Sequence, residues 1–153
     1  MQNIIEKHFS ASDLAAINTK IDELEALISG KLQNLTDEEN SRYGSIDETN
    51  KLFVNKVNDY SNNQPSLMSP DVDWAEFSKD YFDRSALQNT AMRLDAISKA
   101  CTETKRMHDY DNYQNSLLDK KYTDYKADTG GGALYDTKSA EYKQIFKLSL
   151  IHI

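Results

Sequence analysis

Apolar residues recur along this chain at steps of three and four residues. Because an α-helix turns once every 3.6 residues, that spacing places them on one side of each helix. Proline occurs only twice, and no segment alternates with the two-residue period of a strand. We therefore predict an all-α, single-domain, antiparallel helical bundle of about four main helices. The clearest stripes are Leu14, Ile17, Ile21, Leu24 and Ile28, and Leu87, Ala91, Leu94, Ile97 and Cys101.

Helix starts are marked where a serine, threonine or aspartate precedes an acid by three residues. In this capping box the first side chain accepts a backbone N–H and the acid accepts another in return. The boxes are Ser10 with Asp13, Thr36 with Glu39, Ser45 with Glu48, and Asp73 with Glu76. Together with the stripes they predict a domain over residues 1–147 with helices at about 11–34, 45–62, 73–107, 112–127 and 137–147.

Two interruptions separate the later helices. A helix running unbroken from residue 73 to residue 127 would be about 80 Å long at 1.5 Å per residue. The stripe also becomes polar from His108 to Asn112, so we predict a break there. Three consecutive glycines, Gly130 to Gly132, predict a flexible stop before the last helix.

The last six residues, Leu148 to Ile153, read LSLIHI. This string resembles a translation of the transposon-end adapter used to prepare DNA sequencing libraries. We expect residues 148–153 to be a non-native tail, with the natural chain continuing beyond about Lys147. The alternative is a genuine apolar helix end.

Charge and cysteine content limit the classes of partner. Acidic residues outnumber basic ones by 25 to 18, a formal net charge of −7, so we do not expect binding to nucleic acid. An acidic mimic of nucleic acid is an alternative function. The single cysteine forms no intramolecular disulfide, which fits a cytoplasmic protein. No basic leader and no apolar run of about 18 residues occurs, so neither secretion nor a membrane is expected.

The sequence offers no convincing catalytic, cofactor or metal site, and we predict a protein that is not an enzyme. Glu103 and His108 are five residues apart, not the three that a di-iron helical bundle uses. Asp109 and Asp111 flank Tyr110, and these three residues form the alternative site for a metal or small ligand in an enzyme or carrier.

Three further residues have structural explanations. Asp71 and Asp73 precede a helix, where acids cap free N–H groups and offset the helix dipole. Cys101 lies on an apolar stripe, so we expect its thiol to be packed as a small apolar group.

Tyrosines are concentrated in the C-terminal part, where six of the nine lie between Tyr110 and Tyr142. Tyrosine is enriched at binding surfaces because its rigid apolar ring carries a polar tip. Tyr110 and Tyr113 are three residues apart, as are Tyr122 and Tyr125, so each pair is spaced to share a helix face. The predicted interaction surface is Tyr110, Tyr113, Tyr122 and Tyr125, and the alternative is the wet margin of a bundle core.

Around SPDVDW (residues 69–74) and HDYDNYQ (residues 108–114), the chain resembles a family of small all-helical bacterial proteins without an assigned activity. The resemblance extends from about Leu35 to Phe146 and implies no cofactor or site. The sequence therefore favours a protein-interaction or self-association module whose partner is another protein or a second copy of the chain.

Overall fold

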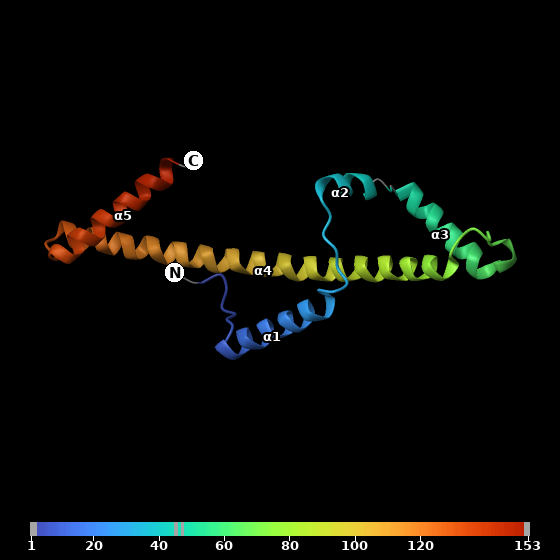
Figure 1. Cartoon of the computed structure of the whole chain (residues 1–153). Helices are drawn as coiled ribbons and strands as arrows, with labels where there is room; N and C mark the ends of the chain where they lie inside the picture. Colours follow the sequence, from blue (N-terminus) through green and yellow to red (C-terminus); the bar gives the residue numbers. More distant parts are fainter. Residues whose placement is uncertain (1–2, 45, 47, 152–153) are drawn as a thin grey trace. The chain divides into compact units, whose positions relative to one another are not determined.

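The protein is all-α, as predicted (Figure 1). The computed structural model describes residues 3–44, 46 and 48–151, and this part of the chain contains no strand. In chain order the elements are α1 (Ala11–Ile28), α2 (Asp37–Tyr43), α3 (Glu48–Asn63), the 3₁₀-helix η1 (Pro65–Leu67), α4 (Trp74–Asp128) and α5 (Ala133–Ile151).

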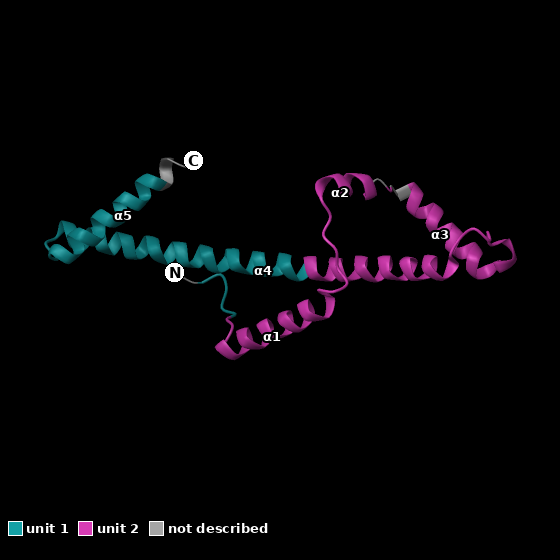
Figure 2. Cartoon of the chain, viewed as in Figure 1, with its two compact units in different colours: residues 1–7, 96–153 teal, residues 8–95 magenta. Residues whose placement is uncertain are grey.

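Two compact units divide the chain (Figure 2). The first combines residues 1–7 with residues 96–153, and the second comprises residues 8–95. The domain boundary at residue 147 stays a prediction. So does the non-native origin of residues 148–153, which continue α5 as far as Ile151 and whose last two residues lie outside the described part.

The first two predicted capping boxes are confirmed. The Ser10 hydroxyl accepts from the Asp13 N–H at 3.0 Å, and the Asp13 carboxylate accepts from the Ser10 N–H at 2.9 Å. The bond from the Ser10 backbone N–H to the carboxylate, and after it the Ser10 side chain, lower the pKa of Asp13. Thr36 and Glu39 form the same arrangement at α2. The box predicted at Ser45 falls on a residue outside the described part of the chain.

The prediction that the first helix extends to residue 34 is wrong. α1 ends at Ile28, where Ser29 closes its last turn by donating its N–H to the Glu25 carbonyl. Gly30 then lies in a turn without a positive φ angle. The apolar residues after it belong to an irregular connection and do not extend the stripe.

The prediction of a break between residues 107 and 112 is also wrong, because α4 is a single helix from Trp74 to Asp128. Asp73 starts it by accepting the N–H groups of Ala75 and Glu76, each at 3.1 Å. No proline or glycine occurs within α4. Polar residues weaken a buried stripe, but they leave the backbone hydrogen bonds of a helix intact.

In the second unit, α3 and η1 pack beside the first turns of α4. Trp74 and Phe77 meet edge to face at 5.3 Å, and the Tyr81 ring stacks on Phe77 at 6.4 Å. The Tyr81 hydroxyl donates to Asn55 Oδ1 of α3 at 3.0 Å. The three aromatic rings are half-buried.

In the first unit, α4 and α5 form a helical hairpin. Gly130 and Gly132 have φ angles of 77° and 102°, which side-chain-bearing residues rarely adopt, so the three-glycine segment is a turn. The Tyr142 hydroxyl of α5 donates to Asp119 of α4 at 2.8 Å, and Lys138 donates to the same carboxylate.

Apolar burial is slight. Ile5 is the only apolar residue classed as buried among those that the structure describes. The expectation that Cys101 is packed is wrong, because its side chain is exposed. The helices thus carry the predicted stripes without a buried apolar core beneath them.

Candidate functional site

The most regular exposed surface is an apolar line along α1, which we call the α1 seam: Leu14, Ile17, Ile21, Leu24 and Ile28. These residues are separated by three, four, three and four positions, so they occupy the a and d positions of two successive heptads and the a position of the next. α1 has no buried residue. The exposed fractions of Leu14, Ile17 and Ile21 are 49%, 42% and 47%, and Leu24 and Ile28 are half-buried.

The predicted stripe of α4 is exposed as well. Leu87, Leu94 and Ile97 have exposed fractions of 51%, 39% and 61%. Because α4 is one continuous helix, these residues follow one another along the same side. Met92 is 64% exposed on the opposite side, since it is two positions, or about 200°, from Leu94.

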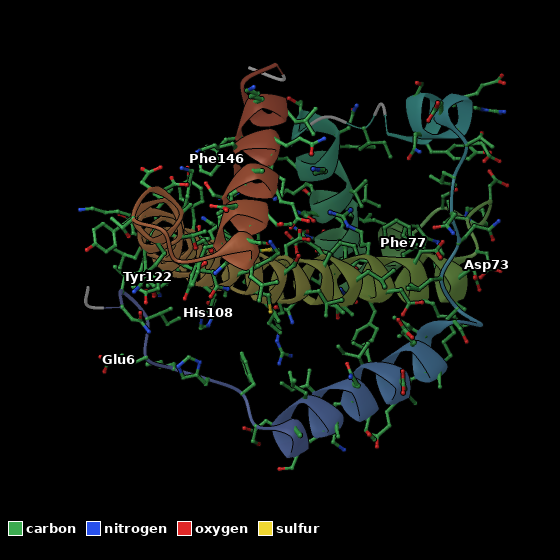
Figure 3. All side chains as sticks on the ribbon, turned by 90° about the vertical axis from the view of Figure 1, so that its left-hand side faces the viewer. Glu6, Asp73, Phe77, His108, Tyr122 and Phe146 are labelled. Carbon is green, nitrogen blue, oxygen red and sulfur yellow. The ribbon has the colours of Figure 1, made fainter. Side chains whose placement is uncertain are left out.

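Asp111 holds the N-terminal segment of the chain against α4. Its two carboxylate oxygens each accept the Ile4 N–H at 3.0 Å, and one also accepts the Ile5 N–H at 3.2 Å. Asp111 is only 7% exposed, and Ile5 is buried beside it. Figure 3 labels Glu6 on the N-terminal segment and His108 on α4. The two backbone N–H groups therefore satisfy a carboxylate in the middle of a helix.

This contact was not anticipated from the sequence. One signal was available: Asp111 follows Ile97 by 14 residues and Thr104 by seven, so an acid occupies the line of the apolar stripe. An acid on such a line requires a partner when it is buried. The sequence contains no indication that the partner is backbone from residues 4 and 5.

The alternative metal or small-ligand site predicted at Asp109, Tyr110 and Asp111 does not form, because the three side chains do not point to one place. Successive residues of a helix point about 100° apart, so Asp109, Tyr110 and Asp111 leave α4 in three directions. Asp109 forms an exposed ion pair with Lys105, and Asp111 binds the N-terminal segment. Tyr110 is 48% exposed. In the described residues, no group of three or more His, Cys, Asp or Glu side chains is arranged to hold a metal ion.

The four tyrosines of the predicted interaction surface lie in different surroundings. All four side chains are exposed. Tyr122 meets Tyr135 of α5 edge to face at 6.1 Å, with Lys126 over its ring. Tyr113 lines a hollow of about 260 Å³ between α4 and α5, together with Leu117, Tyr142, Ile145 and Phe146. The tyrosine surface stays a prediction.

A polar network links α4 to α5 at this hairpin. Ser139 is 2% exposed and donates to Asp124 at 2.6 Å, while Lys120 forms an ion pair with the same carboxylate. The Lys120 bond and then the Ser139 bond lower the pKa of Asp124. Thr123 is fully buried in this region, and its Oγ1 has no partner among the described residues. This network links the two helices of the hairpin, and each oxygen of the Asp124 carboxylate accepts one of its bonds.

A second hollow, of about 360 Å³, lies between α3, η1 and the start of α4. Its walls are mainly apolar, with Phe53, Val57, Tyr60, Met68 and Trp74 among them. The indole N–H of Trp74 is already bonded to the Ser69 carbonyl at 2.8 Å. The hollow therefore offers apolar surface with little directional chemistry.

No family model, curated protein or solved structure matches this chain. The resemblance to small bacterial helical proteins stays a prediction. Within the part of the chain that the structure describes, every helix is too short or too polar to cross a membrane.

Proposed function

We propose that this protein is a non-enzymatic interaction module that associates with copies of itself through the apolar sides of α1 and α4. One observation carries the proposal: all five positions of the α1 seam are apolar, and none of them is buried. Contiguous exposed apolar surface marks an interaction site in soluble proteins. The exposed stripe of α4 supports the same function.

The spacing of the α1 seam favours another helix as its partner. A residue pattern that repeats every seven positions follows a neighbouring helix, because the seam stays in contact as the two helices wind around each other. An amphipathic helix also remains stable mainly through the burial of its apolar side. Burying a leucine or isoleucine side chain contributes about 1.5–3 kcal/mol relative to leaving it exposed. Five such residues are a substantial driving force for association.

Sedimentation equilibrium of the whole chain and four single variants tests this function. Ile21→Glu in α1 and Leu94→Glu in α4 place a charge on the apolar sides. Thr19→Glu and Met92→Glu are matched controls, because each lies two residues away on the opposite side of the same helix. We expect a mass above that of one chain for the unmodified protein and both controls, and a weaker association for the two seam variants.

Two outcomes would contradict the proposal. One is a single-chain mass for the unmodified protein at every concentration. The other is equal weakening by seam and control variants, which would show that charge at any position opposes association. Circular dichroism of each variant checks that helix content is unchanged.

A further inference from the structure

The α1 seam and its flanking charges specify how two copies meet. We infer that α1 pairs with α1 of a second copy in parallel and in register, so that each seam residue faces its own counterpart. This inference rests on the proposed function, because it names the partner and the geometry of the same surface.

The number of seam positions favours the parallel orientation. Leu14, Ile21 and Ile28 occupy a positions, and Ile17 and Leu24 occupy d positions. In a parallel pair, a faces a and d faces d, so all five layers form. In an antiparallel pair each a residue packs against a d residue of the other chain. Three a residues cannot all find partners among two d residues, and one end of the seam would be left uncovered.

The flanking charges favour the same orientation. Lys20 occupies a g position and Glu25 the next e position, which are the positions that face each other across a parallel pair. Each Lys20 would thus meet Glu25 of the other chain. In an antiparallel pair g faces g, so Lys20 would meet a second Lys20 near the centre of the seam.

The ion pair that Lys20 forms within its own helix does not compete strongly with an ion pair to a second copy. Lys20 bonds to Glu23 within α1 at 2.8 Å, with side chains that are 78% and 54% exposed. An ion pair that exposed contributes little to stability. Lys20 can therefore exchange Glu23 for Glu25 of a second copy, or share the two carboxylates. Glu25 is exposed on the side that the second copy would approach.

The α1 seam also lacks a competing partner within the described residues of its own unit. No residue of α1 is buried by α3, η1 or the first part of α4. The aromatic residues of that unit contact one another and α3 instead. A second α1 helix offers an apolar line of equal length and the same repeat, together with complementary charge.

Disulfide trapping tests the register in the 153-residue chain. The native thiol is removed with Cys101→Ser, and a single new thiol is introduced by Leu24→Cys in the seam or by Ala26→Cys outside it. Diamide then oxidises two thiols to one disulfide and is itself reduced to the hydrazine. In a parallel pair the two thiols of the Leu24→Cys protein face each other, within reach of a disulfide, which requires Cα atoms about 4.4–6.8 Å apart.

The antiparallel arrangement has its own reporter. An antiparallel pair has two registers that pack a against d. When residue 24 lies opposite residue 21, two residues 14 lie about 25 Å apart along the helix axis, so the Leu14→Cys protein cannot cross-link with itself as it would in a parallel pair. When residue 24 lies opposite residue 14, two residues 24 lie about 15 Å apart along the helix axis. Those two thiols cannot be joined. A mixture of the Leu14→Cys and Leu24→Cys proteins, both with Cys101→Ser, would instead form a mixed disulfide, which mass spectrometry of the linked peptides identifies.

We expect the Leu24→Cys protein to cross-link at least about tenfold faster than the Ala26→Cys protein at micromolar concentration, because pairing raises the effective thiol concentration to the millimolar range. A mixed 14–24 disulfide, or equal cross-linking at residues 24 and 26, overturns the parallel register. If the chain still sediments above one-chain mass, the proposed function stands and only the register fails. A single-chain mass for both unmodified and Cys101→Ser proteins overturns both.

Discussion

Replacing Asp111 by alanine should release the N-terminal segment from α4. The variant removes both acceptor oxygens from the Ile4 and Ile5 N–H groups, which bind them at 3.0–3.2 Å. A hydrogen bond to a charged group contributes about 1.5–3 kcal/mol to stability. Two donors lose their acceptor, so the free energy of opening the segment should fall by about 3 kcal/mol or more.

The hydrogen-bond energy lost in Asp111→Ala is large compared with the energy of the contacts that still hold the segment. Fixing the backbone of one residue costs about 1–2 kcal/mol, so holding residues 4 and 5 alone costs about 2–4 kcal/mol. Burial of Ile5 returns about 1.5–3 kcal/mol. Without the carboxylate these terms nearly cancel, and the segment should be open for much of the time.

Amide hydrogen exchange measures this opening directly. Each 1.36 kcal/mol corresponds to a tenfold change, so protection of the Ile4 and Ile5 amides should fall about a hundredfold or more in the Asp111→Ala protein. Asp109→Ala is the matched control, because it removes a carboxylate two residues away whose ion pair with Lys105 is exposed. Unchanged protection in Asp111→Ala, or the same loss in Asp109→Ala, would refute the assigned role of Asp111.

Two further predictions concern the turn and the polar contacts of the α4–α5 hairpin. Gly132→Ala should destabilise the hairpin by about 1–2 kcal/mol, because Gly132 has a φ angle of 102° that alanine rarely adopts. Gly30→Ala is the control and should be neutral or stabilising, since Gly30 has no positive φ angle and an added Cβ would meet open space. Thermal melts of both variants measure the two effects. Bonds to Lys138 and then Tyr142 lower the pKa of Asp119 below 3.8, and the bond to Asp119 raises the pKa of Tyr142 above 10.0. The Asp119 contribution to stability is thus present above about pH 4 and is lost as the pH falls through the lowered pKa, while the Tyr142 contribution is lost as the pH rises through the raised one. The difference in melting temperature between the unmodified protein and Asp119→Asn should therefore be constant near neutral pH and vanish in acid; a difference that persists at pH 2 would contradict this assignment.

Local features of the fold were predictable because their causes lie within a few residues. The boxes at Ser10 and Thr36 each join groups three positions apart, so the sequence contains both partners. The glycine turn before α5 is equally local, since positive φ angles are favourable for glycine. The three- and four-residue spacing of apolar residues was likewise sufficient to predict the all-α class.

Other features could not be predicted, because the apolar pattern of one helix does not show which other parts of the chain contact it. The polar residues from His108 to Asn112 suggested a break, but polar side chains leave the backbone hydrogen bonds of a helix intact, and no proline or glycine is present there. Burial of Cys101 was inferred from its place on the apolar stripe of a helix, but a stripe does not show whether another element packs over it, and Cys101 is exposed. The contact of Asp111 joins residues 106 and 107 positions apart, which no local pattern indicates.

We propose that exposed apolar helix surfaces join copies of this chain, so the mass of the unmodified protein in solution is the decisive quantity. Sedimentation equilibrium at neutral pH and moderate salt, over a wide range of protein concentration, measures that mass without a variant or a label. We expect a multiple of the 17.5 kDa chain mass that falls toward the mass of one chain on dilution. A constant 17.5 kDa species at every concentration, with its helix content intact, would contradict it.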